Sequence, residues 1–162
     1  MTDLNSSIFD YCIALAKKRE SKWSKKLKQN YHKTIFNRNY ELIGLLGEII
    51  YGLYSGELLD VKQYQSGDDG ADFNKRVQVK TSEVIKAKYL IEYTDKDFSK
   101  FDYFVMVLVD LENKSGYVKS WISTKDFLKR KTVMDFGYGK RYAMKIEEMN
   151  PCKKGTEYIS SL

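Results

Sequence analysis

The chain has few of the residues that build cross-linked, zinc-bound or histidine-based sites. Its 162 residues include two cysteines, Cys12 and Cys152, one histidine, His32, and one proline, Pro151. The cysteines lie near opposite ends of the chain, so they match neither a zinc-ligand spacing nor a disulfide framework. We therefore expect two reduced thiols, as in a cytoplasmic protein. A lone histidine in a polar connection is more often a surface residue than a general base.

Long apolar runs and linker-like segments are also missing. The longest apolar run, YFVMVLV over 103–109, is much shorter than the about 20 residues that a helix needs to cross a bilayer. The N-terminus is polar where a secretory signal would be apolar. These features predict a soluble, intracellular protein that does not act at a membrane. No repeat or Pro/Gly-rich linker divides the chain, so residues 1–162 are expected to form one domain.

Positive charge is concentrated at one end of the chain. The net charge is +6; residues 1–38 hold nine Lys or Arg against three Asp or Glu, whereas residues 39–162 hold nineteen of each. We therefore divide the domain into a basic helical arm, 1–38, and a core, 39–162. A basic patch attracts polyanions by releasing counterions, although a solvated helix face is the alternative. The DNA-binding residues predicted in this arm are Lys17, Lys18, Arg19, Lys22, Lys25, Lys26, Lys28, Lys33 and Arg38.

Hydrophobic periodicity predicts helices first and mostly strands afterwards. One helix is expected from Ser6 or Ser7 through at least Ala16, and a second from about Asn39 to Tyr54. Strands are expected over 58–64, 71–73, 77–81, 101–110, 117–122 and 142–147. A short helix capped by Ser123 or Thr124 should precede the last of them. This order predicts an α/β fold in which helices flank a central mixed β-sheet.

The second helix carries a narrow polar stripe. Residues 42–54 contain no lysine or arginine, which indicates a mostly buried helix. The residues that share one face at helical spacing are Glu41, Gly44, Glu48, Gly52 and Ser55. Glycine inside a helix costs about 1 kcal/mol relative to alanine. We therefore expect another backbone to approach this stripe, with Glu48 pointing at it; an exposed carboxylate on an amphipathic helix is the alternative.

A predicted hairpin brings a third group of polar residues together. The turn over 74–76 joins a strand that contains Asp72 to one that contains the sequence QVK. On the second strand Gln78 and Lys80 share one face, and Val79 points into the core. Asp72 should then meet Gln78 and Lys80 at one end of the pair. The QVK sequence alone is weak evidence, because surface strands often alternate in this way.

These motifs resemble the PD-(D/E)xK nuclease superfamily, in the branch that includes Holliday-junction resolvases and some restriction and homing endonucleases. The family pattern is a helix glutamate, an aspartate often in a G-x-D turn, and (D/E)-x-K on the next strand. This sequence supplies Gly47-Glu48, Gly70-Ala71-Asp72 and Gln78-Val79-Lys80, followed by an apolar strand. The resemblance covers roughly 42–110. Gln78 departs from the usual carboxylate, although glutamine variants occur in the superfamily.

The resemblance implies a restriction-endonuclease-like core and metal-dependent hydrolysis of DNA. Glu48, Asp72, Gln78 and Lys80 would be catalytic. Asp72, Glu48, Gln78 and the backbone carbonyl of Val79 would hold Mg²⁺, for which Mn²⁺ can substitute. Lys80 would orient or deprotonate the attacking water. A homodimer or higher homo-oligomer is expected, because cutting both strands usually needs two sites.

Two other functions remain open from the sequence. A non-catalytic nucleic-acid-binding protein of the same fold would result if activity was lost when Gln78 replaced the acid. An RNA-cleaving nuclease is the other. In either case the loop over 136–142, in which Lys140 and Arg141 lie among glycines and aromatic residues, is a second candidate for DNA contact. An ordinary strand-connecting loop is the alternative for that segment.

Overall fold

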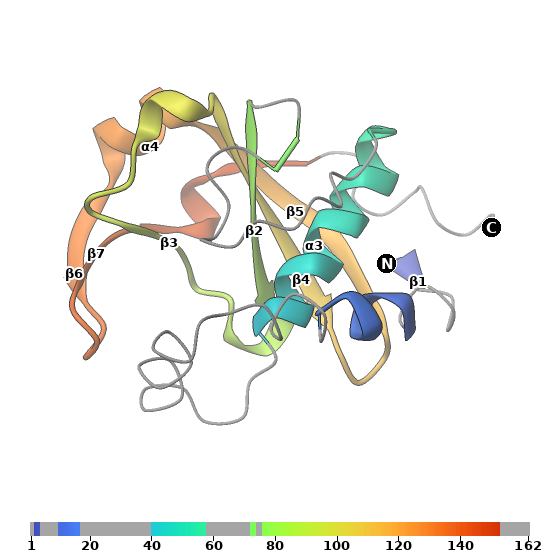
Figure 1. The fold of residues 1–162 in the computed structure, drawn as a ribbon. Helices are drawn as coiled ribbons and strands as arrows, with labels where there is room; N and C mark the ends of the chain where they lie inside the picture. The colour runs from blue at the N-terminus through green and yellow to red at the C-terminus, as the bar shows by residue number, and fades with distance from the viewer. Residues whose placement is uncertain (1, 4–9, 17–39, 58–71, 74–75, 153–162) are drawn as a thin grey trace.

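The computed structural model describes residues 2–3, 10–16, 40–57, 72–73 and 76–152 (Figure 1). Residues 10–16 are helical. The other helices and strands are β1 (Thr2–Asp3), α3 (Tyr40–Ser55), β2 (Val77–Glu83), β3 (Tyr89–Tyr93), β4 (Tyr103–Asp110), β5 (Ser115–Ser123), α4 (Thr124–Arg130), β6 (Thr132–Asp135), β7 (Lys140–Lys145) and β8 (Asn150–Pro151). Short 3-10 helices cover Val84–Lys86, Phe98–Lys100 and Ile146–Glu148. None of the described helices is long and apolar enough to span a membrane. The basic arm over 17–38 and the strand expected over 58–64 lie outside the described residues.

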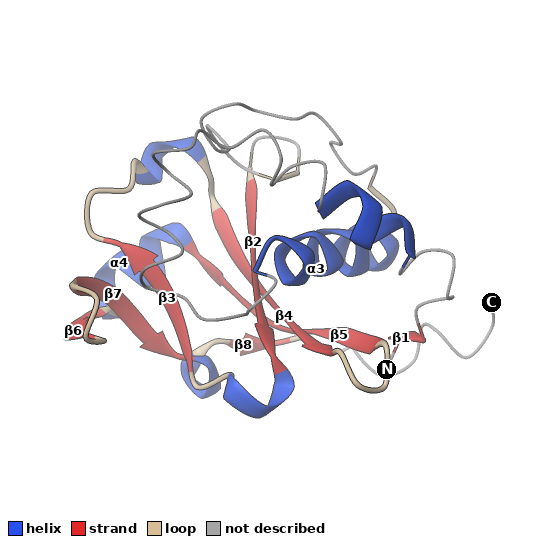
Figure 2. Ribbon diagram, turned by 60° about the horizontal axis from the view of Figure 1, so that its bottom comes forward, coloured by secondary structure: helices blue, strands red, loops and turns tan. Residues whose placement is uncertain are grey.

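The larger sheet is mixed and has the order β1-β5-β4-β2, with β8 also paired to β5 (Figure 2). β2 runs parallel to β4, from Val77 opposite Tyr103 to Glu83 opposite Val109, and β4 runs antiparallel to β5. α3 crosses one face of this sheet, and α4 packs on the other side of it. The predicted α/β class, with helices flanking a central mixed sheet, is confirmed.

Two hydrophobic clusters show which way each sheet residue faces. Leu45 and Ile50 of α3 pack in one cluster with Val79 of β2, together with Val107 of β4. Side chains alternate along a strand. Gln78 and its neighbours at even positions therefore face the second cluster. β2 lies between two packed layers, so Gln78 is only 7% exposed and Val79 only 8%.

The second cluster is formed by the other face of the sheet and by a second sheet. It joins Phe104 and Met106 of β4 to Leu90 of β3, Phe127 of α4 and Met144 of β7. The second sheet is antiparallel, with the order β3-β7-β6. Sequence patterning did not predict β3 or β6. Each strand has only four or five residues, which is too few to show a clear alternation of polar and apolar side chains. This sheet covers the face of β2 that carries Gln78.

The bounds of the last predicted strand were wrong. We expected a strand over 142–147 after a glycine-rich loop, but β7 is Lys140–Lys145. Its first residues are paired: Lys140 lies opposite Asp135 of β6, and Arg141 lies opposite Met134 of β6 and Tyr93 of β3. Lys140 and Arg141 are therefore strand residues. Pairing with two neighbouring strands outweighs the local glycine signal that favoured a loop.

The buried second helix is confirmed, but the position of its closest contact is not the one expected. A Cβ at Gly44, in the predicted stripe, would meet nothing within 4 Å in the described part of the chain. A Cβ at Gly47 would overlap Oγ1 of Thr81, and one at Gly52 would lie 3.1 Å from the carbonyl oxygen of Glu57. α3 therefore rests on β2 through Gly47, which lies outside that stripe.

The short helix after β5 agrees with its predicted cap. The Ser123 hydroxyl accepts a hydrogen bond from the backbone N–H of Asp126, which lies in the first turn of α4. Such a cap satisfies one of the N–H groups that a helix start leaves without a helical partner. The cap residue is therefore Ser123 rather than Thr124, whose hydroxyl instead donates to the carbonyl of Phe101.

Candidate functional site

The predicted turn brings Asp72 against the beginning of β2. Phe73 and Val77 form an antiparallel bridge, and the Arg76 N–H donates to the Phe73 carbonyl at 2.9 Å. Oδ2 of Asp72 accepts from Nε2 of Gln78 at 2.7 Å and from the Val79 N–H at 2.5 Å. The expected meeting of Asp72 with Gln78 is therefore confirmed.

The Gln78 amide bridges an acid and a base. Its Nε2 donates to Asp72, while its Oε1 accepts from the ammonium of Lys96 at 3.3 Å. Only this orientation of the amide satisfies both neighbours, because a carboxylate can only accept and an ammonium can only donate. Lys96 follows β3 after a two-residue turn, and no motif in the sequence predicted it for the site.

Lys80 contacts a different acid from the one expected. Its Nζ lies 2.7 Å from Oε2 of Glu92 on β3, and the side chains of Lys80 and Glu92 are 26% and 1% exposed. The Tyr93 N–H donates to the other carboxylate oxygen at 2.9 Å. A buried carboxylate is costly without a partner, so the ammonium offsets the loss of hydration.

Glu92 is the main residue that the sequence analysis missed. The segment YLIEY contains a signal for it. Glu92 comes two residues after Leu90, so in a strand both side chains point to the same face, which is the one that packs in the core. An acid at a core-facing position of a strand usually has a specific partner. The five-residue length of β3 hid this pattern, since so short a run gives little periodicity to measure.

Glu48 belongs to the helix that packs on one face of β2, whereas Lys80 projects from the other face. This helix is α3, where the adjacent Gly47 packs on Thr81. Thr81 and Val79 share the α3 side of β2, whereas Lys80, opposite Met106, is on the side of the second sheet. Glu48 is also close to the Cys12 thiol: burial raises the pKa of Cys12 to about 11, and the negative charge of Glu48 adds to this rise.

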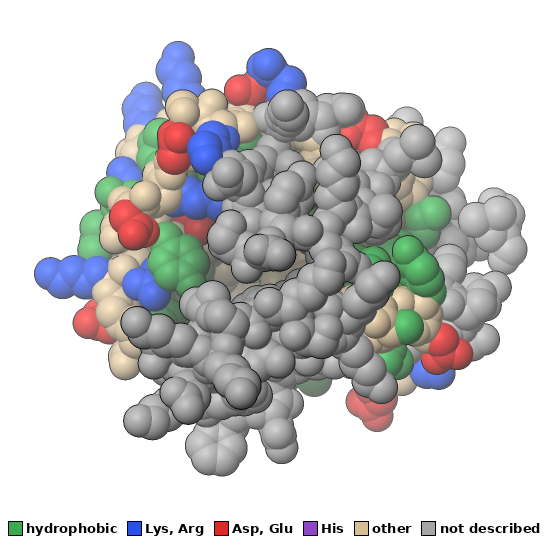
Figure 3. Space-filling view, viewed as in Figure 1, with side chains coloured by type: hydrophobic (Ala, Val, Ile, Leu, Met, Phe, Trp, Pro, Cys, Tyr) green, Lys and Arg blue, Asp and Glu red, His purple; other side chains and the backbone are tan. Residues whose placement is uncertain are grey.

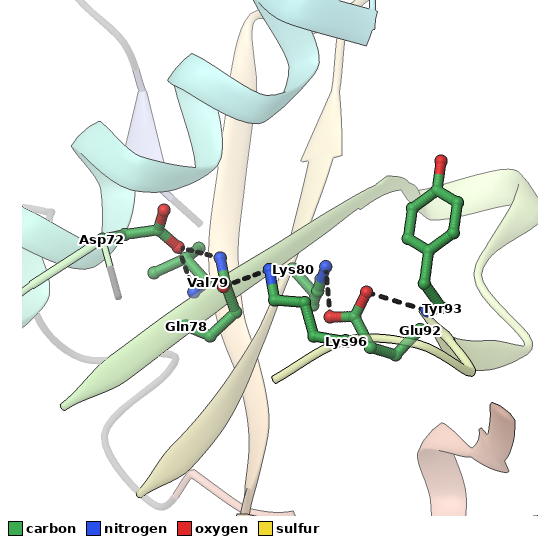
Figure 4. Close-up of polar contacts among 7 residues, drawn as sticks. All are labelled: Asp72, Gln78, Val79, Lys80, Glu92, Tyr93 and Lys96. Carbon is green, nitrogen blue, oxygen red and sulfur yellow. Dashed lines mark hydrogen bonds and ion pairs between the residues drawn. The ribbon is translucent and has the colours of Figure 1, made fainter. Parts of the chain in front are cut away.

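Figure 4 shows the polar side chains in a row that crosses from Asp72, past Gln78, to Lys80, Lys96 and Glu92. Two carboxylates and two ammonium groups make this row balanced in charge. The Val79 N–H points to Asp72, and the carbonyl of the same strand residue points to the same side. Carboxylate, amide and carbonyl oxygens therefore lie near one edge of β2, with cationic groups beside them.

The acids of this row do not form a metal-binding cluster by themselves. Within the described ranges, no group of three or more His, Cys, Asp or Glu side chains is placed to hold a metal ion. The predicted ligand set has only two acids, Asp72 and Glu48, and draws its other oxygens from Gln78 and Val79. Its chemistry therefore depends on an amide and a backbone carbonyl.

The predicted DNA-binding residues divide into two groups. Those of the arm lie outside the described residues. Lys140 is exposed, and the Arg141 guanidinium lies over the rings of Tyr93 and Tyr138. In Figure 3, Lys and Arg side chains lie next to exposed hydrophobic ones at the left, where Figure 1 places β3, β6 and β7, with acidic side chains among them.

The chain was also compared with known proteins. A scan against protein-family models and searches of curated proteins and of solved structures gave no match. Any functional assignment therefore rests on the side chains around β2 and on the order of the motifs along the chain.

Proposed function

We propose that the protein is a DNA endonuclease that hydrolyses phosphodiester bonds with Mg²⁺. The observation that carries the proposal is the contact of Asp72 with Gln78 and Val79 at the edge of β2. It joins an aspartate before a tight turn to the Q-x-K strand, in the order that the PD-(D/E)xK superfamily uses. On this proposal the fold is a restriction-endonuclease-like core that acts in the cytoplasm as a homodimer or higher homo-oligomer.

The donor set suits magnesium in its chemistry. Mg²⁺ prefers hard oxygen ligands and keeps several waters. Asp72, the Gln78 amide oxygen and the Val79 carbonyl supply such oxygens, and Glu48 would join them from the α3 side. An amide oxygen has two lone pairs, so the bond from Lys96 leaves one for an ion. When bound, Mg²⁺ or Mn²⁺ would supply an activated water and neutralise charge on the phosphate.

The protein's own groups would position and stabilise the reacting phosphate. The Val79 N–H and the Gln78 amide fix the Asp72 carboxylate, so it needs no reorganisation during the reaction. Lys80 would orient the attacking water and stabilise developing negative charge. Lys96, which the fold brings beside Gln78, adds a second ammonium to the same row.

A cleavage screen tests this proposal. Supercoiled plasmid, linear duplex and four-way junctions are incubated with Mg²⁺, with Mn²⁺ and with a chelator. We expect metal-dependent nicking by the wild type. Asp72→Asn should abolish nicking and leave DNA affinity intact or higher, because it removes a metal ligand and a negative charge. Asp110→Asn, at the half-buried last residue of β4, is the matched control and should cleave normally.

Two results would change the assignment. Full activity in Asp72→Asn would remove Asp72 from the site. Tight DNA binding without cleavage under any metal condition would favour the non-catalytic binder, for which the structural argument is that Lys80 is paired to Glu92 and Gln78 carries no charge. Faster cleavage of structured RNA than of DNA would favour an RNA nuclease.

A further inference from the structure

A continuous row of ring and guanidinium groups lies along one face of the second sheet. Its order is Tyr93, Arg141, Tyr138, Phe136 and Tyr89. The guanidinium carbon of Arg141 is 4.4 Å from the Tyr93 ring centroid and 5.6 Å from that of Tyr138. The centroids of Tyr138 and Phe136 are 6.0 Å apart in a stacked pair, and those of Phe136 and Tyr89 are 6.1 Å apart. We call these five residues the stacking row.

Strand pairing and one turn create this row. Arg141 lies opposite Tyr93, so the antiparallel pairing of β3 and β7 puts both side chains on the same face. The turn between β6 and β7 then returns Tyr138 onto Phe136. Gly137 and Gly139 have φ of +84° and +106°, which other residues rarely adopt. The arrangement is thus built by the fold, and two glycines make its turn possible.

The strand residues on this face carry positive charge and no negative charge. From the register, the described residues of β3, β6 and β7 that share it are Tyr89, Ile91, Tyr93, Thr132, Met134, Arg141, Ala143 and Lys145. Tyr89 and Tyr93 are the first and last residues of β3. Tyr89 lies opposite Lys145, and Tyr93 lies opposite Arg141. Glu92 points to the other face, where it contacts Lys80.

The row is accessible to a ligand. Tyr93 is 57% exposed and Tyr138 is 52% exposed. A single exposed tyrosine needs no explanation. Connected aromatic faces beside cationic groups, however, are what proteins use to hold successive unpaired bases, since every base has a π-face and every nucleotide a phosphate.

We infer that the stacking row binds unpaired bases of the DNA substrate, on the opposite face of the sheet that contributes Glu92 to the candidate active site. Tyr93 begins the row and directly follows Glu92, the partner of Lys80, on β3. Its ring lies on the opposite face of the strand from the Glu92 carboxylate, so bound bases would lie across this sheet from Lys80. The inference rests on the proposed function, and it narrows the substrate to DNA with single-stranded regions such as flaps, bubbles or branch points. Fully paired linear duplex would bind less tightly.

Binding measured without metal tests this inference apart from cleavage. Fluorescein-labelled dT20, a 20-base-pair duplex and a 20-nucleotide RNA are titrated with the full chain in a chelator, at two salt concentrations. We expect the wild type to bind dT20 more tightly than the duplex. Tyr138→Ala and Arg141→Ala should each weaken dT20 binding roughly 5- to 150-fold, the range measured for loss of one stacking contact.

Two further variants separate stacking from charge and from general surface effects. Arg141→Lys keeps the charge but loses the planar group, so it should weaken dT20 binding while preserving the salt dependence. Trp121→Ala removes an exposed aromatic residue outside the row and should bind like wild type. Equal affinities for dT20 and duplex, or no effect of Tyr138→Ala, would overturn the inference. Tighter binding of the RNA would replace DNA with RNA as its ligand.

The outcome is distinguishable from that of the proposed function. Metal-dependent nicking together with unaltered dT20 binding in Tyr138→Ala would refute the stacking row and leave the nuclease standing. Loss of dT20 binding in Tyr138→Ala without any cleavage by the wild type would support the row and refute the nuclease.

Discussion

Gln78 stands where the PD-(D/E)xK pattern that the sequence resembles has a carboxylate, and its contacts give a physical reason for an amide there. The amide donates to Asp72 and accepts from Lys96 at the same time. A carboxylate has no donor, so glutamate in this place would put two negative oxygens at hydrogen-bond distance. The residue is also 7% exposed, where an unpaired charge is expensive. Glutamine is therefore compatible with this buried row as it stands, without an added cation.

The Lys80–Glu92 pair leads to a prediction about stability. Glu92→Gln should lower the free energy of unfolding by about 3 kcal/mol, because it leaves the largely buried Lys80 ammonium without a counter-charge. The double variant Lys80→Met/Glu92→Leu should recover most of that loss, since an apolar pair needs no hydration. Urea denaturation of the three proteins measures both changes. A Glu92→Gln protein as stable as wild type would show that the pair contributes little.

The same double variant separates a structural role from a functional one. It should fold but fail to nick plasmid DNA, because Lys80 is proposed to act on the phosphate. Lys80→Ala alone is a poorer test, since it would leave Glu92 buried and unpaired and could inactivate the protein by unfolding it. Wild-type cleavage by the folded double variant would mean that the pair serves the fold alone.

At the level of elements, the contact between α3 and β2 sets the geometry of the site. Gly47 lets the helix backbone approach Thr81, and the apolar residues of α3 then cover the Val79 side of the strand. With that face covered by the helix, Gln78 and Lys80 face the second sheet, which supplies Glu92. The helix that carries Glu48 and the side chain of Lys80 consequently lie on different faces of β2.

Two glycine substitutions in α3 test this contact. Gly47→Ala should destabilise the protein by about 1–3 kcal/mol, because its Cβ would overlap the Thr81 side chain in a packed interface. Gly44→Ala is the matched control, since its Cβ meets nothing within 4 Å in the described chain. Alanine should be neutral there or stabilising by about 1 kcal/mol through helix propensity. Equal unfolding free energies for the two variants would contradict this packing.

On the scale of the whole molecule, the helix over residues 10–16 is part of the main core. Cys12, Leu15 and Ala16 belong to the cluster that α3 forms with the larger sheet. Both cysteines are free, as expected from their spacing. Burial, and then the nearby charge of Glu48, raises the pKa of the Cys12 thiol from 9.0 to about 11. The folded protein therefore holds the thiol proton more tightly than the unfolded chain.

This difference makes stability depend on pH in the alkaline range. The contribution of Cys12 is fully present below pH 9 and is lost as the pH rises towards 11, because the unfolded thiol ionises first. Compared with Cys12→Ala, the wild type should lose at most about 2.5 kcal/mol more over that range. Urea denaturation from pH 8 to pH 11 measures the difference. Parallel curves for the two proteins would show that Cys12 does not titrate in this way.

The sequence by itself determined the parts of the protein that depend on near neighbours. Helical periodicity predicted α3, the pair Ser123-Thr124 before an aspartate predicted a cap for α4, and a tight turn predicted the contact between Asp72 and Gln78. These features arise from hydrogen bonds and spacing within a few residues, so a short segment contains the information that specifies them. The α/β class also followed, because the order of such segments limits how they can pack.

Only the tertiary structure decided which partners the polar side chains meet. The layers packed on the two sides of β2 decide which side chains each face of the strand meets. The contacts of Lys80 with Glu92 and of Gln78 with Lys96 therefore could not be predicted from the local sequence around these residues. The stacking row likewise depends on Tyr93 pairing with Arg141, from strands far apart in the chain. Such contacts depend on long-range packing, in which burial of apolar surface across the whole fold outweighs any local preference.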